Sequence, residues 1–279
     1  MKRLDNARRG TAGGFTLVEL LVVMGIIGLL VGLLIPAVNY AITAGRVAAT
    51  HNVISGLSTG LYTFKADWNV FPPSRRGTFG VSSMVTYNKQ YGFQLLPLYL
   101  IGPQGNGWGA GNNKLSPFGS PAVGQFGPYF QPERGADITV VRDAFPLTQR
   151  SVSTSTDSCA GCILYYRFDP NGTPPAVTGF TGLSGLLDCQ DNLTTLSVES
   201  PTEGFKDAAH FVRAVAVPAP QGGGTRPARW RSEDFVLISA GPDRLFGHVR
   251  IRADGIPEAI KQGDDPGDFT YDDVTSFSR

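Results

Sequence analysis

The stretch that decides the fold is FTLVELLVVMGIIGLLVGLLIPAV, residues 15–38, in which Glu19 is the only ionisable side chain. At about 1.5 Å per residue this stretch makes roughly 36 Å of helix, enough to cross a hydrocarbon core of about 30 Å. The preceding segment is short and basic, with Asp5 opposed by Lys2, Arg3, Arg8 and Arg9. Because basic flanks stay in the cytoplasm, the pattern predicts one membrane span with a cytoplasmic N-terminus and the bulk of the chain outside.

Two ordinary explanations fit this segment less well. A cleaved secretory signal has an apolar core of about 7–15 residues followed by a small-residue cut site. The apolar run here is longer, and the small-residue stretch at 47–49 lies far beyond its end. A plain signal anchor explains the length and orientation but not the carboxylate of Glu19 inside the run. An acidic residue in such a place is a candidate functional site.

The hexapeptide GFTLVE, residues 14–19, resembles the class III signal of type IV pilins and type II secretion pseudopilins. The similarity extends over roughly residues 8–70. It implies that a prepilin peptidase cuts between Gly14 and Phe15 and that the new Phe15 amine is N-methylated. It also implies that Glu19 pairs with the Phe15 amine of a neighbouring subunit in the filament. Pro36 falls where this family often carries a helix-bending proline, so we expect a kink or local melting there.

After Pro36 the sequence becomes amphipathic. Apolar residues recur every three, four or seven positions, which predicts a helix with one apolar face: Val47, Ile54, Leu57, Leu61 and Phe64. The stretch at 62–72 is similar to the end of the pseudopilin stem helix, and Pro72-Pro73 ends it. The sequence thus divides into a leader (1–14), a transmembrane and filament-core helix (15–38), an amphipathic stem helix (39–70) and a periplasmic or extracellular domain (71–279).

Most of the 35 glycines and 20 prolines follow residue 70, which favours short elements joined by loops. Apolar runs predict a short helix or turn at 94–100 and strands at 162–168, 211–217 and 235–239, with a turn at 169–172. We therefore expect an α+β fold. Its long N-terminal helix, half transmembrane and half amphipathic, packs on a loop-rich globular domain with a small antiparallel β-sheet.

The three cysteines are Cys159, Cys162 and Cys189. The C-x-x-C spacing of the first two would suggest metal or redox chemistry in the cytosol. Outside the membrane a disulfide is the favoured interpretation, with free thiols as the alternative. Three cysteines make an incomplete zinc site, and His210 is a distant fourth ligand. The pairing stays open, with one cysteine left over.

The C-terminal region is rich in aspartate. The stretch at 239–247 and the later Asp pairs resemble the end of major pseudopilins, where a calcium ion often ties the loop down. Clustered carboxylates and loop carbonyls suit calcium, which takes six to eight oxygen ligands. The residues that the resemblance suggests as ligands are Asp243, Asp265, Asp272 and Asp273, with a solvated acidic loop as the alternative. Arg244 departs from the family's glycine.

The sequence offers little support for an enzyme or a nucleic-acid-binding protein. The net charge is +1, so there is no basic footprint for nucleic acid. We find no nucleophile elbow, metal-ligand helix motif or phosphate loop, and His51, His210 and His248 are scattered. No cofactor is expected beyond a possible Ca²⁺. A membrane-tethered enzyme or binding module remains the rival class.

The resemblance therefore implies a structural subunit of a type II secretion pseudopilus that polymerises through its N-terminal helix and supports protein export. A type IV pilus pilin, either major or minor and with or without an adhesive role, is the alternative. The implied partners are a prepilin peptidase, other copies of the chain, minor pseudopilins, an inner-membrane assembly platform and membrane lipid. The implied location is the bacterial inner membrane, with the C-terminal domain in the periplasm or in a filament.

Overall fold

The structure is a computed structural model. It describes residues 16–75, 91–109, 116–118, 122–132, 138–145, 161–195, 208–220, 226–242, 246–247, 249–251, 257–259 and 273–277. The chain forms two compact units, Met1–Gly45 and Arg46–Arg279, and the boundary between them falls inside the first helix, α1 (Leu17–Trp68).

The first unit consists, in its described part, of the N-terminal half of α1. Apolar side chains occupy all sides of this half, and its large ones are exposed. Among the described residues α1 is the one helix long and apolar enough to cross a membrane. The helix continues without interruption through Pro36, so the local melting expected there is not observed. The bend expected at Pro36 stays a prediction.

The second unit begins with the C-terminal part of α1, residues 46–68, which confirms the predicted amphipathic helix. Four apolar side chains at the predicted spacing are at most 2 % exposed: Ile54, Leu57, Leu61 and Phe64. Burial of each stabilises the fold by roughly 1.5–3 kcal/mol. Polar residues at other positions of this part of α1, such as Asn52 and Thr59, are exposed.

A short helix, α2 (Gly92–Ile101), packs into the same core. It matches the short element predicted at 94–100, and all of its residues are buried. It ends at Gly102, whose φ of 85° lies in the region that glycine adopts without strain. The Gly102 N–H donates to Leu98 O at 3.1 Å, which satisfies one carbonyl at the end of the helix.

The central sheet has the antiparallel order β2-β1-β5-β8. Its strands are β1 (Leu164–Asp169), β2 (Leu186–Leu187), β5 (Phe235–Ser239) and β8 (Val274–Thr275). Two strand pairs lie apart from it: β3 (Ala216–Val217) with β4 (Arg229–Trp230), and β6 (Val249–Ile251) with β7 (Pro257–Ala259). A 3₁₀ helix, η3 (Cys189–Thr195), follows β2. The α+β class, with a long N-terminal helix and a small antiparallel sheet, is confirmed.

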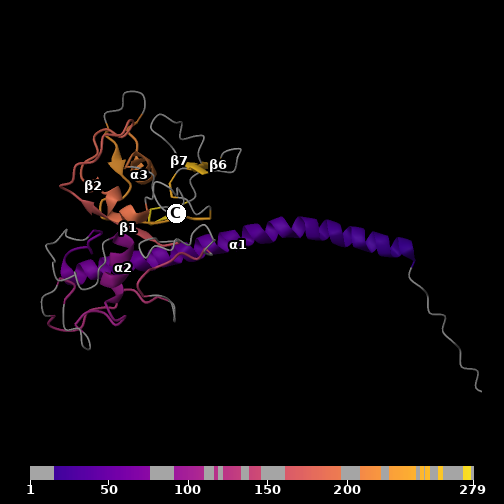
Figure 1. The fold of residues 1–279 in the computed structure, drawn as a ribbon, viewed down its shortest axis with the longest axis horizontal. Coiled ribbons are helices and arrows are strands. Elements are labelled where there is room, and N and C mark those ends of the chain that lie inside the picture. Colours follow the sequence, from indigo (N-terminus) through magenta and orange to yellow (C-terminus); the bar gives the residue numbers. More distant parts are fainter. Residues whose placement is uncertain are drawn as a thin grey trace, which may run out of the picture. The chain divides into compact units, whose positions relative to one another are not determined.

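Side chains from the two faces of the central sheet enter different cores. Tyr165 of β1 and its register partner Leu237 of β5 pack in the cluster that contains the stem residues and α2. Their neighbours Leu164 and Tyr166 pack in a second cluster with the helix α3 (Ala208–Val215). This alternation follows from the two-residue period of a strand. Figure 1 shows the resulting layers, with α2 on one side of β1 and α3 on the other.

The strand predicted at 211–217 is wrong. Residues 208–215 form α3, and only Ala216 and Val217 are extended. The apolar run at 211–217 favours a strand by local preference, but buried side chains recur at Phe211, Ala214 and Val215, one face of a helix. Packing of this face on the sheet outweighs the local preference. The strands predicted at 162–168 and 235–239 are confirmed, and Asp169 begins the expected turn by accepting the Asn171 N–H at 2.9 Å.

Gly92 marks a close approach between α2 and β1. A Cβ atom there would lie 2.0 Å from Tyr165 O, a contact that backbone movement alone could relieve. We predict that Gly92→Ala lowers the free energy of unfolding by about 1–3 kcal/mol. Thermal unfolding of the full chain in detergent measures the loss.

The matched control is Gly45→Ala in α1, where an added Cβ meets no atom within 4 Å. This change is expected to be neutral or to stabilise the helix by up to about 1 kcal/mol. Equal effects of the two substitutions would contradict the packing assigned to Gly92.

Candidate functional site

Thr16 and Glu19 form a capping box at the N-terminus of α1. Thr16 precedes the first helical residue, and its Oγ1 accepts the Glu19 backbone N–H at 3.2 Å. In return, Glu19 Oε2 accepts the Thr16 backbone N–H at 2.9 Å and the Thr16 hydroxyl at 2.8 Å. The box satisfies two of the backbone donors that the start of a helix leaves without partners. The Glu19 carboxylate is therefore held beside the N-terminal end of α1.

This arrangement places the carboxylate close to the expected cleavage site. The helix N-terminus carries partial positive charge, which favours an anion there. The Thr16 N–H belongs to the peptide bond with Phe15, so Glu19 Oε2 lies within one residue of the expected new N-terminus. Gly14 and Phe15 lie outside the described residues, so cleavage between them stays a prediction.

Around and after Glu19, the surface of α1 is apolar over several helical turns. Leu17 is 78 % exposed, Ile27 54 % and Leu34 60 %. A contiguous apolar surface of this size exceeds what soluble monomers expose, and it marks a contact with lipid or with another protein chain. The first unit thus combines one carboxylate, hydrogen-bonded to Thr16, with an apolar helix whose surface requires contact with lipid or with another protein chain.

Cys162 is disulfide-bonded and buried beside β1, and the pairing of the three cysteines stays a prediction. Cys189 keeps its thiol and is partly buried at the start of η3. Cys159 lies outside the described residues, so it is the cysteine to test as the partner of Cys162.

The predicted calcium ligands fall mostly outside the described residues, namely Asp243, Asp265 and Asp272. Asp273 is buried, and its Oδ2 accepts the Gly247 N–H at 2.7 Å. Within the described part of the chain, no three His, Cys, Asp or Glu side chains gather in a way that could hold a metal ion. Calcium binding stays a prediction.

The histidines fall at separate places in the fold. His51 is partly exposed on α1, and His210 is buried on α3. His248 lies outside the described residues. The positions of His51 and His210 add nothing to the case for an enzyme.

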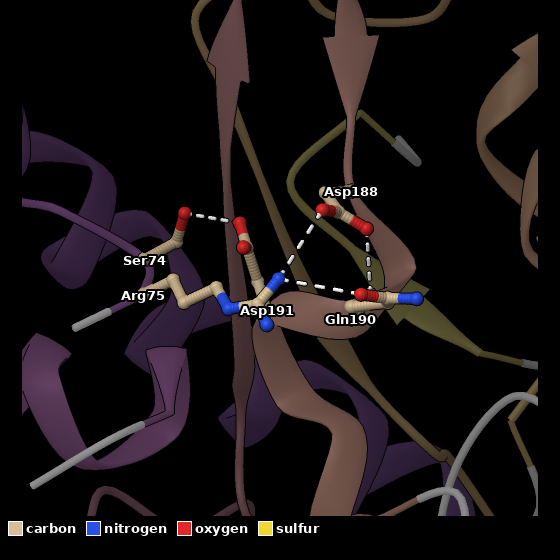
Figure 2. Close-up of polar contacts among 5 residues, drawn as sticks. All are labelled: Ser74, Arg75, Asp188, Gln190 and Asp191. Carbon is tan, nitrogen blue, oxygen red and sulfur yellow. Dashed lines mark hydrogen bonds and ion pairs between the residues drawn. The ribbon is translucent and has the colours of Figure 1, made fainter. Parts of the chain in front are cut away.

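Two features of the polar interior were missed from the sequence. Asn192 of η3 is fully buried; its Oδ1 accepts the Phe93 N–H and its Nδ2 donates to Tyr165 O, both at 2.9 Å. Beside it, the Asp191 carboxyl is buried and accepts the Ser74 hydroxyl (Figure 2). Neither feature leaves a local signal, because the hydrogen-bond partners are 27 to 117 residues apart in the sequence. The capping box does leave one, the T-x-x-E spacing of residues 16–19.

Comparison with known families finds one match. Residues 9–35 match the family model described as the prokaryotic N-terminal methylation motif. The match includes the expected cut, the capping box and the first part of α1. No curated protein and no solved structure matches the chain significantly.

The capping box predicts the order of the first turn of α1. Thr16→Val removes the hydroxyl that accepts the Glu19 N–H, so exchange of the Glu19 amide is expected to rise by roughly threefold to tenfold. Hydrogen exchange of the full chain in detergent measures it. Thr16→Ser keeps the hydroxyl and serves as the control. Equal protection in the two variants would contradict the box.

Proposed function

We propose that this chain, whose N-terminal methylation motif and long apolar helix fit a type IV pilin-like subunit, is a structural subunit of a type II secretion pseudopilus. A prepilin peptidase cuts it between Gly14 and Phe15 and the Phe15 amine is methylated. The subunit then polymerises through α1 to support protein export. The observation that carries the proposal is the motif match at residues 9–35 in register with the Thr16–Glu19 box.

The membrane step follows from the first half of α1. Its exposed apolar side chains are those that a bilayer covers, and four basic residues precede it. In the proposal the subunit waits in the bacterial inner membrane with its leader in the cytoplasm and its second unit in the periplasm. During assembly, neighbouring helices replace lipid around the same surface.

The assembly step gives Glu19 its role. In a filament core, an unpaired carboxylate and an unpaired amine would each be costly, whereas together they largely offset one another. In the proposal, Glu19 exchanges its hydrogen bonds with Thr16 for the methylated Phe15 amine of a neighbouring subunit. Because Glu19 is the only ionisable side chain in the apolar run, this pairing sets the register of the subunits. Pro36 would let the helix adapt its curvature.

A type IV pilus pilin, major or minor, uses the same N-terminal chemistry and is the second candidate. The resemblance of the stem ending at residues 62–72 to pseudopilins supports the secretion role. Genes for a secretion ATPase, an outer-membrane secretin and minor pseudopilins beside this one would favour secretion. The proposed partners are the prepilin peptidase, minor pseudopilins, the inner-membrane assembly platform, other copies of the chain and, before assembly, membrane lipid.

Processing depends on the residue before the cut. A side chain at position 14 would crowd the peptidase active site, so Gly14→Val is expected to leave the uncut precursor in the membrane. Electrophoretic mobility in cells that express the peptidase reports the outcome. Gly13→Val, one residue further away, is the control and should be cut. Normal processing of Gly14→Val would refute the assigned site.

Assembly depends on Glu19. We expect Glu19→Ala to be cut and inserted normally but to enter filaments poorly, because the Phe15 amine of the neighbour loses its partner. The fraction of the subunit in sheared filaments measures incorporation. Glu233→Ala removes an exposed carboxylate from the second unit and should assemble as the wild type does. Equal incorporation of both variants would remove the role of Glu19.

A further inference from the structure

Tyr40 is the one aromatic residue in the described part of the first unit, and it comes directly after the apolar run. Its side chain is 78 % exposed. In the sequence, no aromatic residue lies between Phe15 and Tyr40, and the next charged residue after Glu19 is Arg46. The exposed large side chains before Tyr40 are all aliphatic or methionine. Tyr40 therefore marks a change in the surface chemistry of α1.

The helical turn around Tyr40 is polar but carries no charge. Tyr40 follows Asn39, which is exposed. The Thr43 hydroxyl donates to Asn39 O at 3.0 Å, within the same helix. A hydroxyl that is bonded to its own helix can lie where water is scarce. This turn is therefore too polar for the hydrocarbon core of a bilayer, although it does not require full exposure to water.

The spacing of Glu19 and Tyr40 matches the thickness of a hydrocarbon core. Tyr40 follows Glu19 by 21 residues, and α1 is helical throughout this interval. At about 1.5 Å per residue the two lie roughly 32 Å apart along the helix, against about 30 Å for the core. The capping box holds the Glu19 carboxylate beside the N-terminal end of α1. A helix with Tyr40 at one edge of the core therefore has Glu19 at the other.

A tyrosine fits the edge of the core better than its centre. Its ring is apolar and its hydroxyl is polar, so the ring can pack on acyl chains while the hydroxyl bonds to headgroup oxygens. Tyrosine and tryptophan are enriched at both membrane–water interfaces for this reason. The aliphatic side chains of the run are at home anywhere in the core, so they do not fix the depth of the helix. Tyr40 has the chemistry to fix it.

We propose that Tyr40 is an interfacial anchor, which lies in the phospholipid headgroup layer on the periplasmic side and sets the depth of the unassembled subunit in the bilayer. This inference rests on the membrane step of the proposed function. With Tyr40 at one edge, Glu19 lies at the cytoplasmic edge and stays out of the hydrocarbon before assembly. The expected cut precedes Glu19 by four residues, so the same anchor keeps the cut on the aqueous side.

The test is a depth profile of the full chain in vesicles of phosphatidylethanolamine and phosphatidylglycerol. Nitroxide labels are attached to Leu29→Cys, Val38→Cys or Ile42→Cys, whose native side chains are all exposed. Each is made with Cys189→Ser, which removes the free thiol. Collision with oxygen, which concentrates in hydrocarbon, is compared with collision with a water-soluble nickel chelate. We expect the oxygen-to-nickel ratio to be highest at 29, intermediate at 38 and lowest at 42.

Substitution of Tyr40 tests the anchor itself. Tyr40→Leu extends the apolar surface through Ile42, so the oxygen-to-nickel ratio of the label at 42 is expected to rise by about threefold or more. Tyr40→Trp keeps an interfacial ring and is the control, with an unchanged ratio. An equal ratio at 42 for Tyr40→Leu and for the chain with Tyr40 would overturn the proposal.

Two further outcomes separate this proposal from others. Spin–spin broadening at 42 would show a second copy of the chain beside Tyr40 and would overturn the assignment to headgroups. A ratio at 29 as low as that at 42 would mean that the helix does not enter the bilayer, and the membrane step of the proposed function would fail as well. A high ratio at 29 together with an equally high ratio at 42 would contradict the anchor alone.

Discussion

The structure depends on the change in hydrophobic pattern along one helix. Up to Gly45, α1 is apolar on all sides, and its large side chains are exposed. From Arg46 onward one face is apolar, and the residues Ile54, Leu57, Leu61 and Phe64 form the centre of a core with α2 and one face of the sheet. The hydrophobic effect acts on both halves, but only the second half finds its cover within its own compact unit. The first half needs a bilayer or other subunits.

From the sequence alone, the helices and strands that can be predicted are those whose buried residues recur with a helical or strand period. The stem face, α2, β1 and β5 are found because helical or strand spacing marks the residues that are buried. The segment at 208–217 defeats the same reasoning, because its apolar residues fit a strand locally while the sheet selects a helix, α3. The Ser74–Asp191 and Asn192 contacts escape prediction for another reason. Their partners are brought together by the topology of the chain, and a polar residue in a short polar segment looks the same in the sequence whether it is buried or exposed.

At the candidate site the limits are different. The capping box of Thr16 and Glu19 was not predicted from the sequence, although its T-x-x-E spacing is a known signal for one. The expected role of Glu19 in assembly belongs to a state with a neighbouring subunit, which no property of one chain displays. The structure adds the hydrogen bonding of Glu19 in a single chain, with no neighbouring subunit present. In the single chain the carboxylate is satisfied by Thr16, so the proposed pairing with a neighbour would be an exchange of hydrogen bonds.

The central claim is that the mature protein begins at Phe15, one residue before the capping box of α1. N-terminal sequencing and intact mass of the protein extracted from membranes, in cells with and without the prepilin peptidase, test this most directly. The account predicts a chain that begins at N-methylated Phe15 only when the peptidase is present, and a chain that retains residues 1–14 without it. A chain that keeps its leader in both cells, or one cut after the apolar run, would contradict the account.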